Sequence, residues 1–326
     1  MTKLFSATNG STHKLTLTLQ NDVGAAVIGH DKRNAIVELK IRPFVRVIQT
    51  KPFREWQQSL HPSASEAAGV DAITAIEAVI TGSGDDYIVG DDSANFLAGQ
   101  DGADTISGGG GSDSIEGGLG ADILSGGAGS DTIDGGIGDD ILSGGAGDDK
   151  LVGGGGTDTV SFADASSGVT VTLKDDGSGS ATGQETGTDT LEGISNVIGG
   201  SGADILTGNV ESNTLAGGAG DDTYKVSDGD DVIRTGGGSD VLEISAGYTI
   251  DTVILDSKSG DLTFSLEKVA DKSVHTVRVE GHSVMPLSAL RVYKDSSEYD
   301  DYSLSVIYDP TTNTYRAATD LPTRID

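Results

Sequence analysis

Aliphatic residues recur at every ninth position between Thr81 and Ser161, and glycine or polar residues fill most of the places between them. Nine consecutive copies of one unit, Gly-Gly-x-Gly-x-Asp-x-aliphatic-x, make up this stretch, and residues 126–134 (GGAGSDTID) are a typical copy. A period this short predicts a solenoid, in which each unit packs only on its neighbours. The eighth position is aliphatic in all nine copies: Ile88, Leu97, Ile106, Ile115, Leu124, Ile133, Leu142, Leu151 and Val160.

Each column of the repeat has a local structural reason. The last three residues of a unit are too few for a helix but enough for a short strand. Because neighbouring side chains of a strand point to opposite faces, the eighth residue can point inward. Glycine at the first, second and fourth positions permits a tight loop with positive φ. We therefore expect an all-β parallel β-roll, in which two units form one coil and stacked coils form two sheets around an aliphatic ladder.

The sixth position places a carboxylate in each glycine loop. It holds Asp86, Asn95, Asp104, Asp113, Asp122, Asp131, Asp140, Asp149 and Asp158. Residues 81–161 contain 16 acidic side chains and one basic side chain, Lys150. Stacked coils lie about 4.8 Å apart, within the Debye length of about 8 Å, so these carboxylates repel one another. Burying one Leu or Ile contributes roughly 1.5–3 kcal/mol, whereas ordering nine backbone residues costs roughly 9–18 kcal/mol. Without a counter-ion, the repeats should be disordered or loosely collapsed.

Calcium fits this combination of groups better than other metals. It accepts six to eight oxygen ligands in loose geometry, and these loops offer aspartate carboxylates and backbone carbonyls. Magnesium demands strict octahedral geometry, and zinc prefers Cys and His, which the repeat lacks. If loops stack on the same edge of the roll, each copy of the repeat lies next to the copy two places later. Nine copies then form about seven such pairs, and each pair can surround one ion.

A second block of repeats follows at a fixed offset. Residues 71–106 align without gaps with residues 189–224, with 16 identities in 36 positions. An apolar Ile-x-x-Val-Ile run precedes the first glycine loop in both, and we interpret it as a turn that starts each block and covers its open end. The second block has five units, residues 199–243, with Asp204, Asn213, Asp222, Asp231 and Asp240 at the sixth position and Leu206, Leu215, Tyr224, Ile233 and Leu242 at the eighth. About three further sites bring the expected total to about ten calcium ions.

The blocks define five regions. Residues 1–70 form a basic, β-rich N-terminal region, residues 71–161 the first block, and residues 162–198 a β linker with the turn that starts the second block. Residues 199–243 are the second block, and residues 244–326 are expected to form a C-terminal β cap. Val169–Leu173 (VTVTL) is a predicted strand, and several alternating segments after residue 244 are typical of strands. The last residues, from Arg316, are expected to be mobile.

The first 60 residues differ in charge from the rest, with nine Lys or Arg and four Asp or Glu, in a chain whose net charge is −30. Basic residues gather within residues 32–54: Lys40, Arg42, Arg46, Lys51 and Arg54. They either form a solvated strand face that balances nearby acidic repeats or bind an anionic cell envelope such as lipopolysaccharide. Nucleic acid is an improbable partner of so acidic a chain. Cysteine is absent. We expect no transmembrane segment and no N-terminal secretory signal.

The units GGAGSDTID, GGIGDDILS and GGAGDDKLV resemble those of the RTX (repeats-in-toxin) family, and the likeness covers residues 71–310. It implies a calcium-bound parallel β-roll and an extracellular or cell-surface protein of a Gram-negative bacterium, exported by a type I secretion apparatus through an uncleaved C-terminal signal. It also implies that the sixth-position residues above are calcium ligands. The implied carbonyl donors are the loop glycines Gly109, Gly111, Gly118, Gly120, Gly127, Gly129, Gly136, Gly138, Gly145, Gly147, Gly154 and Gly156. Ser93, Glu211 and the two Asn depart from the pattern, which puts the second unit of each block in doubt.

RTX repeats accompany proteases, lipases, pore-forming toxins, adhesins and S-layer proteins, so the repeats alone do not decide the function. No HExxH, GxSxG, GxxxxGK[ST] or GxGxxG motif occurs, and we expect no enzyme. His275 and His282 could serve zinc or acid–base chemistry, although surface histidines are the simpler interpretation. The leading hypothesis is a secreted structural protein that self-associates into an S-layer or coat. The alternatives are a secreted adhesion or calcium-binding factor, or the calcium module of an undetected hydrolase.

Overall fold

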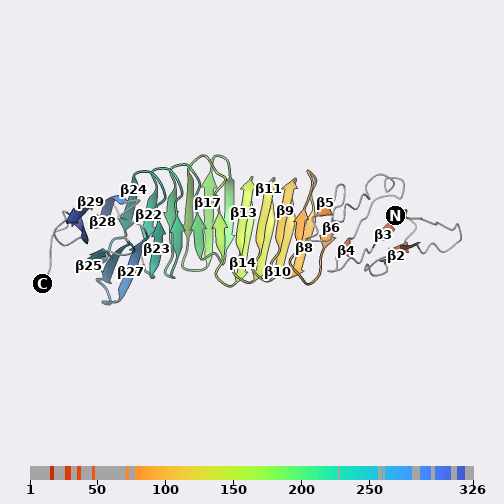
Figure 1. The fold of residues 1–326 in the computed structure, drawn as a ribbon, viewed down its shortest axis with the longest axis horizontal. Helices are drawn as coiled ribbons and strands as arrows, with labels where there is room; N and C mark the ends of the chain where they lie inside the picture. The colour runs from red at the N-terminus through yellow and green to blue at the C-terminus, as the bar shows by residue number, and fades with distance from the viewer. Residues whose placement is uncertain are drawn as a thin grey trace. The chain divides into compact units, whose positions relative to one another are not determined.

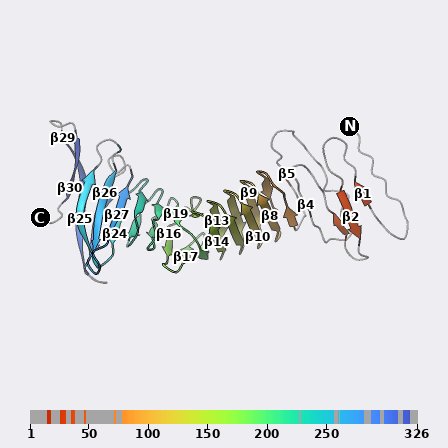
Figure 2. The ribbon, with the colours of Figure 1, turned by 90° about the horizontal axis from the view of Figure 1, so that it is seen from below.

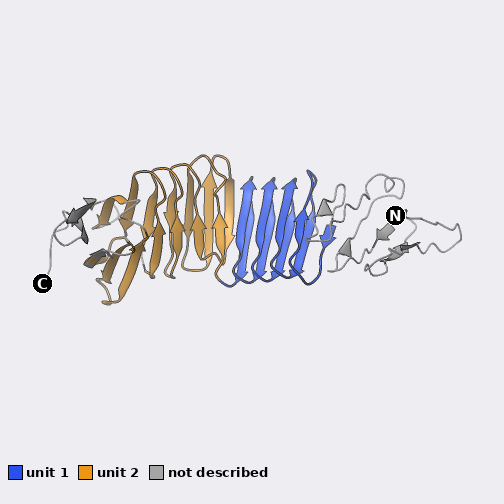
Figure 3. Ribbon diagram, viewed as in Figure 1, with its two compact units in different colours: residues 1–156 blue, residues 157–326 orange. Residues whose placement is uncertain are grey.

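The computed structural model describes residues 78–226, 228–255, 259, 261–280, 287–294, 298–309 and 314–319, together with the short segments 15–17, 26–30, 35–37, 46–47 and 71–72. All regular elements among these residues are β-strands (Figure 1). The chain divides into two compact units, residues 1–156 and residues 157–326 (Figure 3).

Unit 1 contains two parallel sheets built from alternate repeats, seen from two sides in Figures 1 and 2. One sheet contains β6 (Ala78–Ile80), β8 (Phe96–Asp101), β10 (Ser114–Leu119), β12 (Thr132–Ile137) and β14 (Lys150–Gly155). The other contains β5 (Asp71–Ala72), β7 (Tyr87–Val89), β9 (Thr105–Gly110), β11 (Ile123–Ala128) and β13 (Ile141–Ala146). Paired residues are 18 positions apart, as Ile115 with Ile133 and Leu124 with Leu142. The prediction that two nine-residue repeats form one coil is therefore confirmed.

The aliphatic ladder forms the core of the roll. All nine eighth-position residues of the first block are at most 3% exposed. The strands are longer than the three residues expected: in the middle of the block each has six, from the seventh position of one unit to the third position of the next. The pairing continues across the glycines, as Gly118 with Gly136, because these residues stay in register with the coil above. The predicted all-β parallel roll is confirmed.

Unit 2 repeats this arrangement with shorter strands. One parallel series is β15 (Thr159–Ser161), β19 (Asn196–Ile198), β21 (Thr214–Ala216), β23 (Asp231–Arg234) and β27 (Val274–Val279), which β26 (Leu262–Lys268) and β25 (Tyr248–Leu255) extend in antiparallel fashion. The other is β16 (Val169–Leu173), β20 (Ile205–Thr207), β22 (Thr223–Val226), β24 (Asp240–Ile244) and β28 (Leu287–Tyr293). It is extended by β29 (Tyr299–Asp309) and β30 (Thr314–Thr319) at one end and by the hairpin β17 (Ser178–Gly183) and β18 (Gly187–Glu192) beside β16.

One expectation about unit 2 was wrong. The Ile-x-x-Val-Ile run before the second block does not cover an open end, because Val197 is fully buried in β19 with β15 paired on one side and β21 on the other. The predicted strand Val169–Leu173 is present as β16, and it pairs in parallel with β20 of the roll. Of the last residues, from Arg316, residues 316–319 belong to β30, which pairs antiparallel with β29, and the others lie outside the described residues.

The cap of residues after 244 begins where the next coil would lie. Strand β27 pairs with β23 at an offset of 46 residues, as Val277 with Asp231, in place of the usual 18. Strand β28 continues β24 in the same way, with Leu290 opposite Leu242. Phe264, Val277, Val279 and Leu290 are at most 1% exposed, so the cap extends the core. The C-terminal segment therefore covers the last coil of unit 2.

The N-terminal region contributes short strands to the described residues. β1 (Leu15–Leu17), β2 (Ala26–His30) and β3 (Ala35–Val37) form an antiparallel sheet, and β4 (Arg46–Val47) pairs antiparallel with β6. Of the predicted basic patch, only Arg46 belongs to the described residues. The described part of the chain contains no helix long and apolar enough to cross a membrane.

Candidate metal centre

The loops at the edges of the roll have one repeated backbone conformation. All twelve predicted donor glycines have φ between +94° and +145°, a range that side chains rarely tolerate. Their carbonyl oxygens point along the stack: a Cβ on Gly136 would lie 2.2 Å from the Gly118 oxygen, and one on Gly138 only 1.6 Å from the Gly120 oxygen. The second and fourth positions of successive coils thus lie directly on one another, and glycine occupies almost all of them, with Gln100 at φ +79° as an exception.

One oxygen of each sixth-position carboxylate joins neighbouring coils. Asp122 Oδ1 accepts a hydrogen bond of 2.7 Å from the backbone N–H of Asp104, one coil earlier on the same edge. The same bond recurs in unit 1 from Asp86 to Asp104, Asn95 to Asp113, Asp113 to Asp131, Asp122 to Asp140 and Asp131 to Asp149, and in unit 2 from Asp204 to Asp222, Asn213 to Asp231 and Asp222 to Asp240. Hydrogen bonds to a charged group contribute roughly 1.5–3 kcal/mol each. The predicted pairing of every second copy is therefore made directly by these side chains.

In seven of these aspartates the other carboxylate oxygen has no hydrogen-bond donor. Oδ2 is buried and accepts no hydrogen bond in Asp104, Asp113, Asp122, Asp131, Asp222, Asp231 and Asp240. These residues are at most 3% exposed. Such a buried, unpaired anionic oxygen is costly unless a positive group compensates it. The same atom recurring in successive loops indicates a cation site.

The surroundings of this oxygen are themselves rich in oxygen. A Cβ on Gly117 would lie 2.4 Å from Asp122 Oδ2 and 2.5 Å from the carbonyl oxygen of Gly135. The first-position glycine therefore makes room for the carboxylate, and the carbonyl of the same position in the next coil approaches it. The repeat shows that glycine recurs at the first position, but the sequence alone does not indicate that this residue leaves space for the carboxylate. Oxygens of this kind are the ligands that calcium uses.

Burial raises the pKa of the sixth-position carboxyl groups. At Asp104 the loss of hydration on burial raises the pKa by more than the hydrogen bond from the Asp86 N–H lowers it, and the charges of neighbouring carboxylates raise the pKa further. The pKa rises from 3.8 to about 6 at Asp104, Asp149 and Asp240 and to about 7 at Asp222 and Asp231; it is also raised at Asp113, Asp122, Asp131, Asp140 and Asp204. At neutral pH the ionised forms therefore oppose folding unless a cation is bound.

The two Asn loops have a different geometry. Asn95 Oδ1 accepts a hydrogen bond of 3.0 Å from the N–H of Asp91 in its own loop, and the Asp91 carboxylate accepts one of 2.9 Å from the N–H of Ser93. None of these three residues has a positive φ. Side-chain oxygens of this loop therefore accept hydrogen bonds from the backbone N–H groups of the same loop.

The equivalent loop of the second block uses the same bonds. Asn213 Oδ1 accepts from the N–H of Asn209 at 2.8 Å, and Asn209 Oδ1 accepts from the N–H of Glu211 at 3.0 Å. The loop before it is similar, because Asp204 Oδ2 accepts a hydrogen bond of 2.8 Å from the N–H of Gly200. These three loops differ from the others in having a hydrogen bond from the second position to the sixth. The departures Ser93 and Glu211 thus mark a distinct loop type.

Tyr224 is a residue whose place near the site the sequence did not indicate. It occupies an eighth position, and its ring is fully buried. Its hydroxyl accepts a hydrogen bond of 3.1 Å from the N–H of Gly217. A Cβ on Gly217 would lie 2.1 Å from Asp222 Oδ2 and 2.2 Å from the Tyr224 hydroxyl. Burial raises the pKa of the phenol well above its usual range, so the hydroxyl stays protonated beside the carboxylate.

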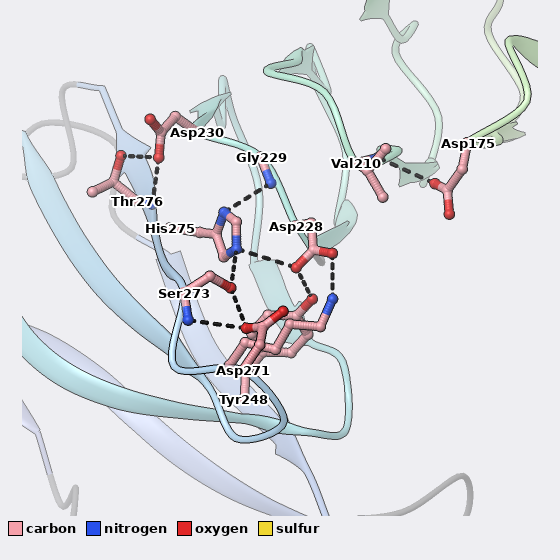
Figure 4. A network of polar contacts seen from close by, with 11 residues as sticks. Asp175, Val210, Asp228, Gly229, Asp230, Tyr248, Asp271, Ser273, His275 and Thr276 are labelled. Carbon is pink, nitrogen blue, oxygen red and sulfur yellow. Dashed lines mark hydrogen bonds and ion pairs between the residues drawn. The ribbon is translucent and has the colours of Figure 1, made fainter.

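His275 lies in a polar cluster between the cap and residues 228–230, which precede β23 (Figure 4). Its Nδ1 accepts a hydrogen bond of 3.3 Å from the N–H of Gly229, while its Nε2 lies 3.0 Å from Ser273 Oγ and 3.3 Å from Asp228 Oδ1. A serine nucleophile relay requires serine and aspartate on different ring nitrogens, which this arrangement lacks. Asp228 also forms an ion pair of 2.5 Å with Lys268, which lowers the pKa of its carboxyl group. The cluster holds the cap on the roll. His282 lies outside the described residues.

Three or more His, Cys, Asp or Glu side chains do not converge on one point anywhere in the described ranges. A cation in the loops would therefore need backbone carbonyls beside its carboxylates, as calcium accepts.

A search of curated proteins finds no match to the chain. The model of the RTX calcium-binding nonapeptide repeat matches residues 80–115, 99–133, 107–142, 125–160, 198–225 and 217–248. The chain thus carries two blocks of RTX calcium-binding repeats, at residues 80–160 and 198–248.

Proposed function

We propose that the chain is a secreted calcium-binding structural protein whose two repeat blocks fold on extracellular calcium and which assembles on the surface of the producing cell as an S-layer or coat. The observation that carries the proposal is the buried Oδ2 without a hydrogen bond, which recurs in both blocks at Asp104, Asp113, Asp122, Asp131, Asp222, Asp231 and Asp240. Among the described residues, these loops contain no basic side chain that could offer positive charge to it. Folding is therefore tied to a cation that the surrounding medium must supply.

We propose two kinds of calcium ligand. They are the sixth-position aspartates of loops whose second and fourth residues have a positive φ, and the backbone carbonyl oxygens of the same loops. Bound calcium would supply the charge that joins neighbouring coils. The loops of Asn95, Asp204 and Asn213 satisfy their N–H groups internally, so we expect them to contribute less to the total of about ten ions.

Dependence of folding on calcium favours export in an unfolded state. A chain that stays unfolded at low cytosolic calcium can pass through a narrow type I secretion apparatus of a Gram-negative bacterium and fold after release. Retention at the cell surface would then depend on self-association and on the basic residues of region 32–54 facing anionic lipopolysaccharide. The proposal includes no catalytic step.

Electron microscopy and sedimentation of the purified full chain test this function. Calcium should convert a disordered chain into a folded one that forms ordered sheets, while magnesium at the same concentration should not. A chain that binds calcium, folds and remains monomeric at high concentration would refute assembly and leave a soluble calcium-binding factor. Turnover of peptide, ester or glycan substrates by the calcium-loaded chain would instead indicate a hydrolase.

A further inference from the structure

The two sheets of unit 1 differ in the charge of their outward side chains. On β7, β9, β11 and β13 the residues flanking each eighth position are Tyr87, Val89, Thr105, Ser107, Ile123, Ser125, Ile141 and Ser143, none of them charged. We call these eight side chains the uncharged face. The equivalent places on β10, β12 and β14 include Glu116, Asp134 and Lys150.

Large apolar side chains are exposed on the uncharged face. Ile123 is 51% exposed, Tyr87 45% and Ile141 39%. Ile123 and Ile141 are direct neighbours in the parallel pairing of β11 and β13. They share the face with the small hydroxyl residues Ser107, Ser125 and Ser143, and none of these side chains is charged.

The same sheet position is uncharged in unit 2 as well. There β15, β19, β21 and β23 present Thr159, Ser161, Asn196, Ile198, Thr214, Ala216 and Val232, and the first charge is that of Arg234. Each unit thus has one sheet with a series of uncharged outward positions.

We infer that the uncharged face of unit 1 is a self-association surface, which packs against the same face of a second copy; the inference rests on the proposed assembly. Two copies with a net charge of −30 repel each other wherever acidic loops or charged faces meet. This face is where they can approach without opposing charges, and its apolar side chains gain by burial. Sheets pack face to face at about 10 Å, which small outward side chains permit.

The size of the face agrees with an array of weak contacts. Four strands spaced about 4.8 Å apart and up to six residues long cover roughly 20 Å by 20 Å. This is about 400 Å² per copy, half of the roughly 800 Å² that each partner buries in a stable complex. One such contact is weak, and several contacts per molecule in a coat add up through effective concentration. The acidic loops border the face, so calcium binding should strengthen the contact.

The test compares two carboxylates introduced at the same repeat position on opposite sheets. Ile123→Glu alters the uncharged face, and Thr132→Glu places the same side chain at an exposed position of β12. The self-association of the calcium-loaded full chain is measured by sedimentation over a range of concentrations. Ile123→Glu should weaken it at least about tenfold, because two carboxylates would face each other, and Thr132→Glu should leave it unchanged. Far-UV circular dichroism with calcium titration checks that both variants fold, and Ile141→Glu gives a second reading of the face.

Each outcome has one meaning. If the wild-type chain assembles and both Ile123→Glu and Ile141→Glu assemble equally well, the contact is elsewhere and the proposed coat function survives. If the wild-type chain stays monomeric in calcium, both the face and the coat fail. If Ile123→Glu assembles normally but no longer adheres to the cell envelope, the face binds an envelope component, and self-association through it is overturned.

Discussion

Replacement of Asp104 by Asn should have opposite effects with and without calcium. Asp104 is 1% exposed, its Oδ1 accepts the N–H of Asp86 at 2.7 Å, and its Oδ2 is buried without a hydrogen bond. Asn keeps the size and the Oδ1 acceptor but removes the charge. Burial raises the pKa of Asp104 from 3.8 to about 6, so the folded state binds the proton more tightly than the unfolded state. Above pH 6 the ionised carboxylate therefore opposes folding of the calcium-free chain by roughly 2–3 kcal/mol, which Asp104→Asn should relieve.

In saturating calcium the same substitution removes an anionic ligand. We expect at least a tenfold loss of affinity at the loop, which corresponds to about 1.4 kcal/mol of lost stability. Urea unfolding followed by far-UV circular dichroism measures both states, with a stabilising osmolyte added to the calcium-free sample. Glu116→Gln is the matched control, because Glu116 is exposed on β10 and should change neither curve. Destabilisation of both states by Asp104→Asn would refute the reasoning.

The remaining predictions concern protons, glycine and the Asn loops. In chelator, acidification from pH 8 to 5 should increase the β content, because the raised pKa values of the buried carboxyl groups let the folded state take up protons. In calcium, the same acidification should lower the apparent calcium affinity, since protons compete for the carboxylates. A steady loss of β content on acidification in chelator would contradict this reasoning. Gly117→Ala should abolish calcium-induced folding of the first block, since its Cβ would collide with Asp122 Oδ2, whereas Gly155→Ala, with no atom nearer than 4.0 Å, should fold normally by circular dichroism. Equal behaviour of the two glycine variants would argue against the packed carboxylate. Asn95→Ala should cost about 1 kcal/mol through the lost hydrogen bond from Asp91 without changing the calcium stoichiometry measured by calorimetry; a lower ion count would show that the Asn loop is a site.

Most of the roll could be predicted because the same residue pattern occurs in many consecutive copies of the repeat. The inward direction of residues such as Leu124 and Ile133 follows from a column that is aliphatic in every copy. The pairing of every second copy follows from two strands per coil. The chemical type of the sixth position likewise predicts a hard cation, since carboxylate and carbonyl oxygens are the only abundant ligands in the loops.

Other features depend on contacts that occur once. The place of Val197 inside the roll could not be read from its sequence neighbours, because the strands that pair with it lie at other positions in the chain. The hydrogen bond from Asp91 to Asn95 depends on a loop conformation that the substitution to Asn only hints at. The division of labour between Oδ1, which joins coils, and Oδ2, which lacks a donor, needs atomic positions.

The ion pair of Lys268 with Asp228 illustrates the same limit. The residues lie 40 positions apart, and nothing in the composition of either segment indicates that they meet. The cap as a β segment was predictable from its alternating pattern, but its pairing with β23 and β24 was not. Local patterns predict strands, whereas a single long-range pairing has no repeated signal to reveal it.

Calcium titration of the purified full chain, followed by far-UV circular dichroism at neutral pH, tests the central claim most directly. The structure predicts little ordered β content and no cooperative melting in excess chelator, and a cooperative gain of both as calcium is added. Full β content with an unchanged melting curve in chelator would contradict the claim that cations between neighbouring coils complete the fold.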